Sequence, residues 1–531
     1  MLVVDINKAN FEYDIHSIVK AFYPEEMVKV LTPETGEDKR KELETDVVFK
    51  ISITEDGAEF YQKKLLQATR IQIEREAKTE KEEKAEERKE ERTAPEQTSE
   101  KGALPVEEEA CSSWHYEEEK DGSFKDAFKR FLYLTLSRIT GKTLPWGNLT
   151  GIRPTKIAYG MLEEKKSHEE ILDFMEKSHF VSEKKARLSI EIAERERQIL
   201  SGVHYEEGYS LYIGIPFCPT TCLYCSFTSF PIVAYRKQVD AYVDCVLKEI
   251  DYVAESMKDK ILDSVYIGGG TPTTLEPDQL DRLIKYLKDK LDFSNVQEFT
   301  VEAGRADSIT REKLQVLYEN GVSRISVNPQ TMKQETLDII GRRHTVEQVK
   351  EAYHMAREVG FTDINMDLIL GLPGETKEDV AATIKEVTAL NPDSLTVHSL
   401  AIKRASRLNL WIQEHGVKTL NNTDETMDIA AKGARSMGMT PYYLYRQKNM
   451  SGNFENVGYA KPSKAGLYNI LIMEEKQTIV ALGAGSITKR VYPDGRIERC
   501  DNVKDVKLYI ENIDEMIERK QKLFAEEASC E

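Results

Sequence analysis

The stretch Tyr212–Phe227, YIGIPFCPTTCLYCSF, decides how the rest of the chain is interpreted. A short apolar strand leads directly into three cysteines, Cys218, Cys222 and Cys225, which are separated by three and then two residues. Thiolates this close together on one loop can hold an iron–sulfur cluster, and three ligands leave one iron open to an external chelator. The spacing therefore predicts a cluster on this loop.

A structural zinc site is the alternative interpretation of these cysteines. Such a site normally has four closed ligands, commonly from two paired knuckles. No second pair is present, because the other cysteines are scattered, at Cys111, Cys245, Cys500 and Cys530. Cys245 lies in a helix-like run and is most simply a buried apolar residue. Seven cysteines in 531 residues do not form a disulfide framework, so a metal site in a reducing compartment is expected.

Short apolar strands alternate with longer amphipathic stretches on either side of this loop. Six strand candidates lie between Ser210 and Leu400, namely SLYIGIPF, SVYIGGG, EFTVEAG, RISVNPQ, INMDLILGLPG and SLTVHSL. Such alternation predicts βα units around a parallel sheet or barrel. Because a closed barrel has eight strands, six favour an incomplete barrel that is open on one side and wide enough for a large substrate.

Length and charge limit the remaining possibilities. A chain of 531 residues predicts two to four domains. Lys and Arg number 74 against 92 Asp and Glu, a net charge of −18, so the surface should repel nucleic acid and anionic membranes. An anionic ligand would need a local basic pocket. No run approaches the roughly 20 apolar residues of a membrane span, and the first residues lack a secretory pattern, so a cytoplasmic protein is expected.

The segments before the strand repeat are of three kinds. Residues 1–73 are expected to be a small α+β module, with the alternating run DVVFKISI followed by the helix-like GAEFYQKKLLQATRIQI. Residues 74–112 have almost no large apolar side chain in most of their length, which predicts a linker that is disordered or helical through Glu and Lys pairs. Residues 113–204 have apolar residues at helical spacing, for example in FKDAFKRFLYLTLSRI.

The repeat itself is assigned to residues 205–405, and residues 406–531 are expected to form an α+β cap. That C-terminal part contains the strand candidates TPYYLYRQ and QTIVALGAG and the helical run NVKDVKLYIENIDEMIERK. We expect it to cover the open side or the mouth of the barrel.

With these motifs the sequence resembles the radical S-adenosylmethionine (SAM) superfamily, and within it the oxygen-independent coproporphyrinogen III oxidase (coproporphyrinogen dehydrogenase) group, especially its HemZ-type branch. YIGIPFC, GGGTPT, VEAG, NPQ, GRRH and MDLILGLPGET occur in the order of that group. The resemblance covers about Ser210–Leu410 well, the C-terminal part loosely and the first 120 residues hardly at all. It implies an α/β fold, a partial (β/α)6 radical SAM barrel.

The resemblance also implies the cofactors, a [4Fe–4S] cluster and SAM. SAM would bind the open iron, and an electron supplied by a donor such as flavodoxin or ferredoxin would cleave it to methionine and a 5′-deoxyadenosyl radical. The glycines after the second strand would let backbone amides approach SAM closely, and Arg342 would bind the methionine carboxylate with its fork. The implied SAM contacts are Tyr212, Tyr224, Gly269, Gly270, Thr271, Glu302, Gln330, Arg342, Asp367 and Ala401. For the two tyrosines, ordinary packing is the alternative.

For the substrate, the resemblance implies coproporphyrinogen III, in porphyrin and haem biosynthesis. The radical would abstract a hydrogen from the β-carbon of a propionate, and loss of carbon dioxide and one electron would leave a vinyl group, twice per macrocycle. A polyanion requires cationic side chains at the barrel mouth. Candidates are Arg343, Lys403, Arg404, Arg407, Arg446, Arg153 and Lys156, each of which could equally be a solvated surface charge. No catalytic role is assigned to His344 or His398.

Two departures from the oxidase pattern leave alternatives open. The best-known oxidases have a further cysteine two residues after the third ligand, where this chain has Phe227. Relatives that bind haem as chaperones carry an HN-x-x-YW type motif, and the nearest stretch here is LYNILIME, Leu467–Glu474. A haem chaperone, or a radical SAM enzyme acting on another tetrapyrrole, therefore remains an alternative to the oxidase.

Overall fold

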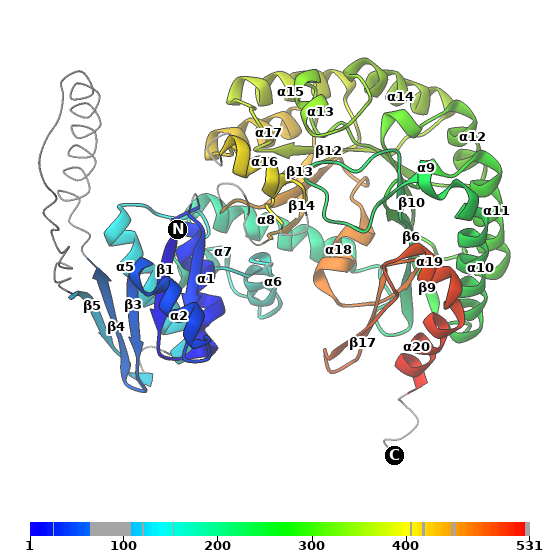
Figure 1. The fold of residues 1–531 in the computed structure, drawn as a ribbon. Coiled ribbons are helices and arrows are strands. Elements are labelled where there is room, and N and C mark those ends of the chain that lie inside the picture. Colours follow the sequence, from blue (N-terminus) through cyan, green and yellow to red (C-terminus); the bar gives the residue numbers. More distant parts are fainter. Residues whose placement is uncertain are drawn as a thin grey trace, which may run out of the picture. The chain divides into compact units, whose positions relative to one another are not determined.

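The computed structural model describes residues 1–24, 26–63, 108–118, 122–151, 153–403, 406–416, 420–447, 450 and 453–525. The chain forms two compact units, Met1–Thr150 and Gly151–Glu531, which are described separately. Figure 1 shows both units, coloured along the sequence.

The first unit is built on a mixed five-stranded sheet with the order β2-β1-β3-β4-β5. β1 pairs in parallel with β2 and β3, and β3, β4 and β5 form an antiparallel meander. Phe22, Phe49 and Phe60 are fully buried in its core. Its strands and main helices are β1 (Leu2–Ile6), α1 (Glu12–Phe22), β2 (Val28–Leu31), α2 (Glu37–Leu43), β3 (Val47–Ile53), β4 (Gly57–Lys63), β5 (Glu108–His115) and α5 (Phe124–Thr140).

The helix expected after DVVFKISI is wrong in its first part, because Gly57–Lys63 is strand β4. Ala58 and Phe60 alternate toward the core, and β4 bonds to a strand on each side, so pairing overrides the local helical pattern. Residues 64–73 of that run lie outside the described residues. β5 begins at Glu108, so the sheet also includes residues assigned to the linker and to the helical segment, while residues 74–107 lie outside the described part.

The second unit contains the six expected strands, all parallel, in the order β13-β12-β11-β10-β9-β6. This confirms the partial barrel. The bounds are β6 (Gly208–Ile215), β9 (Ile261–Gly269), β10 (Glu298–Gly304), β11 (Arg324–Val327), β12 (Ile364–Leu370) and β13 (Ser394–Ser399). Helices between successive strands cover the outer face of the curved sheet, as Figure 1 shows: α10 (Val239–Ser256), α11 (Pro277–Lys290), α12 (Arg311–Glu319), α14 (Val346–Val359) and α15 (Lys377–Leu390).

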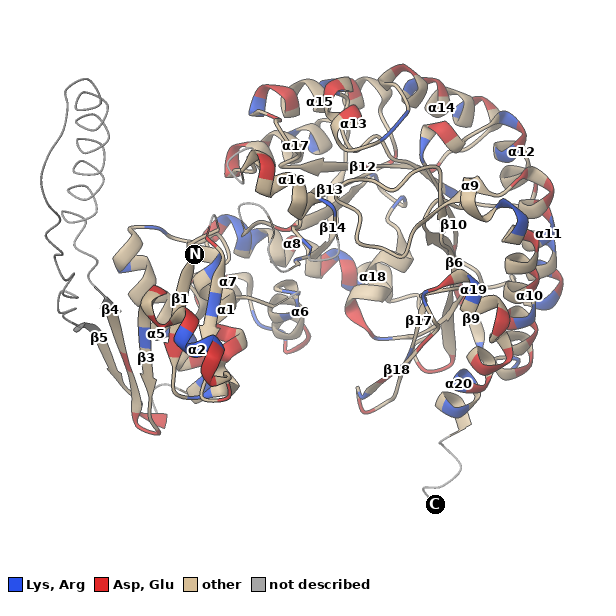
Figure 2. Ribbon diagram, in the orientation of Figure 1, with Lys and Arg blue, Asp and Glu red and all other residues tan. Residues whose placement is uncertain are grey.

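Local sequence explains where these outer helices begin. Thr345 and Gln348 form a reciprocal capping box at the start of α14, and Thr376 and Asp379 do so at the start of α15. Each box satisfies backbone amides that the first turn leaves without a partner. Figure 2 shows both charge signs on these outer helices, whereas the strands are largely uncharged.

The C-terminal segment, expected to be an α+β cap, contributes strands that extend the barrel sheet at both edges. β16 (Thr478–Leu482) pairs in parallel with β6 and is followed by the antiparallel strands β17 (Ile487–Val491) and β18 (Ile497–Asp501). At the opposite edge, β15 (Asn456–Ala460) pairs with β13 and with β14 (Thr440–Tyr445). The strands expected at TPYYLYRQ and QTIVALGAG are thus confirmed as β14 and β16.

Two short helices, α9 (Ile232–Tyr235) and α13 (Gln334–Ile339), lie within the barrel repeat, and further helices of this unit precede the barrel or follow its sixth strand. These further helices are α6 (Thr155–Glu163), α7 (His168–His179), α8 (Glu183–Leu200), α16 (Leu408–His415), α17 (Asp424–Ser436), α18 (Leu467–Glu474), α19 (Val506–Glu511) and α20 (Ile513–Ala525). In the part of the chain that the structure describes, no helix has the length and apolar character needed to cross a membrane.

Candidate functional site

A pocket of about 370 Å³ lies at the carboxyl ends of the parallel strands. Residues from all six strands or the segments that follow them line it, together with side chains from β14, β15 and α18. The predicted cofactor residues at its wall are Cys218, Cys222, Tyr224, Cys225, Gly269, Gly270, Thr271, Glu302, Gln330, Arg342, Asp367 and Ala401. Parallel strands gather their carboxyl ends at one edge, which explains how positions far apart in sequence meet here.

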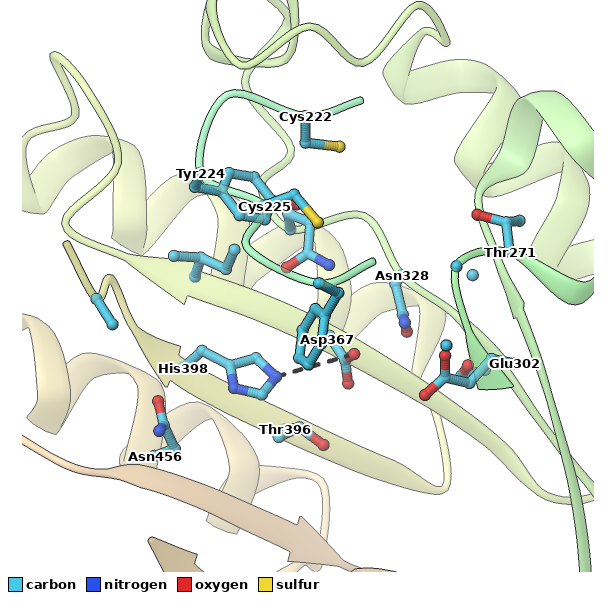
Figure 3. A pocket seen from close by; sticks show the side chains of 18 of the residues that line it. Cys222, Tyr224, Cys225, Thr271, Glu302, Asn328, Asp367, Thr396, His398 and Asn456 are labelled. Carbon is cyan, nitrogen blue, oxygen red and sulfur yellow. Dashed lines mark ion pairs between the residues drawn. The ribbon is translucent and has the colours of Figure 1, made fainter. Parts of the chain in front are cut away.

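The cysteine loop forms one side of this pocket, and Figure 3 shows the side chains of Cys222 and Cys225 there. The Leu223 amide donates to the carbonyl of Ile340, and the Thr271 hydroxyl donates to the Cys218 sulfur at 3.4 Å. Burial raises the pKa of Cys218 to about 11, although this hydrogen bond opposes the rise. The loop is therefore bonded to two neighbouring βα loops.

The glycine turn after β9 lies against the strand that leads to the cysteines. Gly270 donates its amide to the carbonyl of Ile215, and Thr271 donates to that of Phe217, both at 2.7 Å. A Cβ at Gly270 would lie 2.6 Å from the Phe217 carbonyl oxygen, and Gly269 has a φ of +105°. Side chains larger than hydrogen are thus excluded where the two loops touch.

Glu302 lies near the carboxyl end of β10, and its carboxylate accepts a hydrogen bond of 2.5 Å from the hydroxyl of Tyr266. Burial raises the pKa of Glu302 to about 7; the Tyr266 hydrogen bond opposes this rise, and the charge of Asp367 adds to it. Tyr266 in turn packs against Tyr212 and Tyr468, with ring centroids 6.2 Å and 4.5 Å away, and these two rings also contact each other at 5.9 Å. Tyr212 supports this stack and is not among the pocket-lining residues, so its contact with SAM stays a prediction.

Several buried polar atoms at the pocket wall have no hydrogen-bond partner among the described residues. They include Oε1 of Gln330, Oδ1 of Asn328 and Nε of Arg342. Gln330 has a φ of +66°, held by backbone hydrogen bonds to Asp367 and Ile369. Buried polar groups normally find partners, so these atoms are suited to bind a polar ligand.

Asp367 lies across the pocket from the cysteine loop. Figure 3 shows its ion pair with His398, in which the His398 Nε2 lies 3.9 Å from a carboxylate oxygen, and Asn365 also donates to this carboxylate. Burial opposes ionisation, but hydrogen bonds from His398 and Asn365 bring the pKa of Asp367 below its ordinary value. Asp367 is therefore an ionised acceptor facing the pocket.

Of the predicted substrate cations that the structure describes, Lys403 alone lines the pocket. Its ammonium lies 5.5 Å from the ring centre of Phe227, which is 70% exposed. Arg407 donates to the Thr221 carbonyl, and Arg446 is buried and bonded to Asn453. Of the others, Arg153 pairs with Glu475, Arg343 and Lys156 are exposed, and Arg404 lies outside the described residues.

Sequence reasoning missed several pocket residues. Arg305 lies three positions after Glu302, and its guanidinium contacts both Cys222 and Thr220. Arg305 directly follows the strand that carries Glu302, a predicted SAM contact, and this position could have indicated a pocket residue. Asn328 and Tyr443 carried no such signal, because an isolated amide or aromatic residue in a strand is common.

A family model described as Radical SAM superfamily matches residues 212–387, the part that carries the cysteine loop and most of the predicted SAM contacts. Over 414 residues the chain is 40% identical to the oxygen-independent coproporphyrinogen-III oxidase-like protein HemZ of Bacillus subtilis, covering 76% of this chain and 83% of HemZ. The chain belongs to the HemZ-containing coproporphyrinogen oxidase-like family of radical SAM proteins. The resemblance drawn from the motifs is thereby confirmed.

This radical SAM family includes proteins of more than one activity. The haem chaperone HemW of Lactococcus lactis is 31% identical, over 52% of this chain and 68% of HemW. The oxygen-independent coproporphyrinogen III oxidase of Salmonella typhimurium is 28% identical, over 58% and 66%. The solved HemN structure from Escherichia coli aligns at 24% identity with a TM-score of 0.47, over 63% of this chain and 73% of HemN.

Radical SAM proteins use a [4Fe–4S] cluster and SAM, and the pocket fits both. The three thiols lie on one loop, and a four-iron cluster binds them at separate corners. In the described residues, no three His, Cys, Asp or Glu side chains converge closely enough to hold a single metal ion. The unpaired polar atoms of Gln330, Asn328 and Arg342 are chemically suited to SAM, which carries an amine, a carboxylate and hydroxyl groups.

Proposed function

We propose that this protein catalyses the oxygen-independent oxidative decarboxylation of coproporphyrinogen III, converting two propionates to the vinyl groups of protoporphyrinogen IX. The main support is the 40% identity to HemZ, an oxidase-like protein, over 83% of its length. Lys403 adds to this support, because it provides a cation in the pocket of an otherwise acidic protein.

The chain's own residues have separate tasks in this proposal. Cys218, Cys222 and Cys225 hold the cluster, Arg342 binds the carboxylate of SAM, and Glu302 accepts hydrogen bonds from its amine or ribose. When bound, the two cofactors together supply a carbon-centred radical that can abstract hydrogen. Removal of one hydrogen atom from the propionate β-carbon, followed by loss of carbon dioxide and transfer of one electron to an external electron acceptor, leaves the vinyl group.

The substrate is proposed to lie along Phe227, Lys403, Tyr443 and Tyr445. The Lys403 ammonium can pair with a propionate, and the exposed Phe227 ring offers a flat apolar face to a pyrrole. The electron that reduces the cluster would come from a small protein donor such as flavodoxin or ferredoxin.

Haem binding without porphyrinogen chemistry is the second candidate, because HemW is 31% identical over 68% of its own length. In this chain the segment nearest to the chaperone motif, Leu467–Glu474, is helix α18. Tyr468 stacks on Tyr266 there, and Asn469 donates to the hydroxyl of Tyr442. Tyr468 is thus used in packing, whereas Asn469, Ile472 and Met473 of the same helix line the pocket. The enzyme is favoured because the sequence of this segment departs from the chaperone motif.

The test is an anaerobic assay of the reconstituted full chain with SAM, a strong reductant and coproporphyrinogen III. Chromatography should show protoporphyrinogen IX formed in step with 5′-deoxyadenosine. A parallel titration with haem measures whether the protein binds it in stoichiometric amount.

The matched control is the Cys222→Ala variant, which should form neither product. Nucleoside without a vinyl product, together with stoichiometric haem binding, would replace the oxidase proposal with the chaperone. Nucleoside without either result would indicate a different radical substrate.

A further inference from the structure

Arg305 is a buried cation beside the cluster ligands. It directly follows β10, and its side chain is 3% exposed. Its Nη1 donates to the carbonyl and hydroxyl oxygens of Thr220, at 2.9 Å and 2.8 Å, and lies 3.8 Å from the sulfur of Cys222. Thr220 lies between the first two cluster cysteines, so one guanidinium contacts both the loop backbone and a cluster sulfur.

Asp307 holds the other edge of this guanidinium. Nε and Nη2 of Arg305 donate to its two carboxylate oxygens at 2.9 Å and 2.6 Å, a bidentate pair. Behind Asp307 lies fully buried His344, with Nδ1 3.7 Å from the carboxylate. The contacts of Asp307 are thus with Arg305 and His344, whereas Arg305 contacts Cys222, so the positive end of the pair faces the cluster loop and the negative end faces away from it.

A positive charge near a cluster sulfur favours the reduced cluster, because reduction adds one negative charge to it. Hydrogen bonds to the sulfurs and the net charge nearby are among the main determinants of cluster potential. The effect is strong here because burial leaves little water to screen it. A carboxylate bound to the same guanidinium opposes the effect.

We propose that Arg305 raises the reduction potential of the cluster through its contact with Cys222, and that Asp307 both aims this guanidinium and limits its effect. Arg305 is thus a positioning residue that acts through a cluster ligand. The inference rests on the cluster alone and not on the proposed porphyrinogen chemistry, so each can fail without the other.

The test is a potentiometric titration of the reconstituted full chain without SAM. Redox mediators set the potential, dithionite supplies the electrons, and the electron paramagnetic resonance signal measures the reduced [4Fe–4S]⁺ state. In Arg305→Gln, the ratio of reduced to oxidised cluster at a fixed potential should fall about tenfold, which for a one-electron couple is a lowering of about 59 mV.

Asp307→Asn should shift the potential in the opposite direction. Asparagine keeps an acceptor for Arg305 but removes the opposing charge, so we expect the ratio to rise about threefold. If the pair had a purely structural role, the reduction potentials of the two variants would shift in the same direction or would not shift at all. Arg311→Gln is the matched control, because Arg311 is an exposed arginine at the start of α12, and its ratio should stay unchanged.

A ratio in Arg305→Gln within the error of the unmodified protein would overturn the proposal. If that variant does not retain its cluster, measured as iron and sulfide per chain, Arg305→Lys keeps the charge without the fork and should show a smaller fall. The Asp307→Asn variant then decides. A rise in its ratio of reduced to oxidised cluster supports the proposal, and an unchanged or lower ratio rejects it.

Discussion

The two walls of the pocket differ in how they are built. The cofactor wall consists of the cysteine loop, Cys218–Cys225, with Thr271, Glu302, Gln330 and Arg342, and protein contacts already position these groups. The wall that we propose for the substrate, called the substrate wall, comprises Phe227, Lys403, Tyr443 and Tyr445 with the neighbouring His398, and is mainly aromatic with one lysine. The two walls differ most at Phe227, which is 70% exposed and so has few protein contacts to hold it, whereas Tyr443, Tyr445 and His398 pack on one another.

The largest effect is expected when a cluster ligand of the cofactor wall is replaced. Cys222→Ala should abolish the absorbance near 400 nm after anaerobic reconstitution and all cleavage of SAM, because two thiolates cannot replace three. Cys500→Ala, which removes a thiol in β18, should keep both. Retention of the cluster in Cys222→Ala would mean that the ligand set is different.

A smaller effect is expected from Arg342 on the same wall. Arg342→Ala should keep the cluster and weaken SAM binding about 100-fold, since loss of a buried charge-assisted hydrogen bond costs roughly 1.5–3 kcal/mol. Its Nη1 already donates to the Asn328 carbonyl, so the guanidinium is held in place before SAM arrives. Arg342→Lys keeps the charge and should recover part of the affinity. Calorimetry that finds unchanged affinity in the alanine variant would reject the carboxylate-binding role.

Glu302 should make SAM binding depend on pH. Its pKa is raised to about 7 by burial, so affinity should increase about tenfold from pH 6 to pH 8 as the carboxylate ionises. Glu302→Gln should bind less tightly at pH 8 and show a flat profile. The sign is opposite for stability, because a raised pKa makes the free energy of unfolding fall as pH rises through about 7. A sloping profile in the glutamine variant would assign the titration to another group.

The smallest effect is expected on the substrate wall. Lys403→Met should weaken coproporphyrinogen binding about threefold and leave SAM affinity unchanged, since a half-exposed ion pair contributes only about 0.2–1 kcal/mol. Lys385→Met, an exposed lysine of α15, is the control. A hundredfold loss in Lys403→Met would mean that the substrate wall is as firmly organised as the cofactor wall.

The sequence indicated the cofactor wall through its motifs. The spacing of Cys218, Cys222 and Cys225 predicted a cluster, and the resemblance to the radical SAM superfamily supplied Glu302, Gln330 and Asp367 as SAM contacts, which the structure brings to one pocket. The substrate wall could not be found this way. Arg407 and Arg446 look available in the sequence, but the fold engages them with Thr221 and Asn453.

Long-range pairing explains the errors in the fold. The run that contains Gly57–Lys63 has apolar and basic residues at spacings compatible with a helix, and its strand conformation depends on two partner strands. The parallel pairing of β16 with β6 could not be predicted from the sequence either, because no local pattern specifies a partner strand so far along the chain.

The pairing of β16 with β6 affects how the protein folds during its synthesis on the ribosome. Ser210 on β6 bonds to Gln477, at the start of β16, and the two lie 267 residues apart in the sequence. At a synthesis rate of roughly 5–20 residues per second, β6 waits about 13–50 s for its neighbour. Limited proteolysis of stalled nascent chains would measure when protection appears. Until β16 emerges, the backbone groups on one edge of β6, the strand that leads to the cluster loop, have no partner strand. During this interval the nascent chain should depend most on chaperones, which prevent such an edge from pairing with another chain.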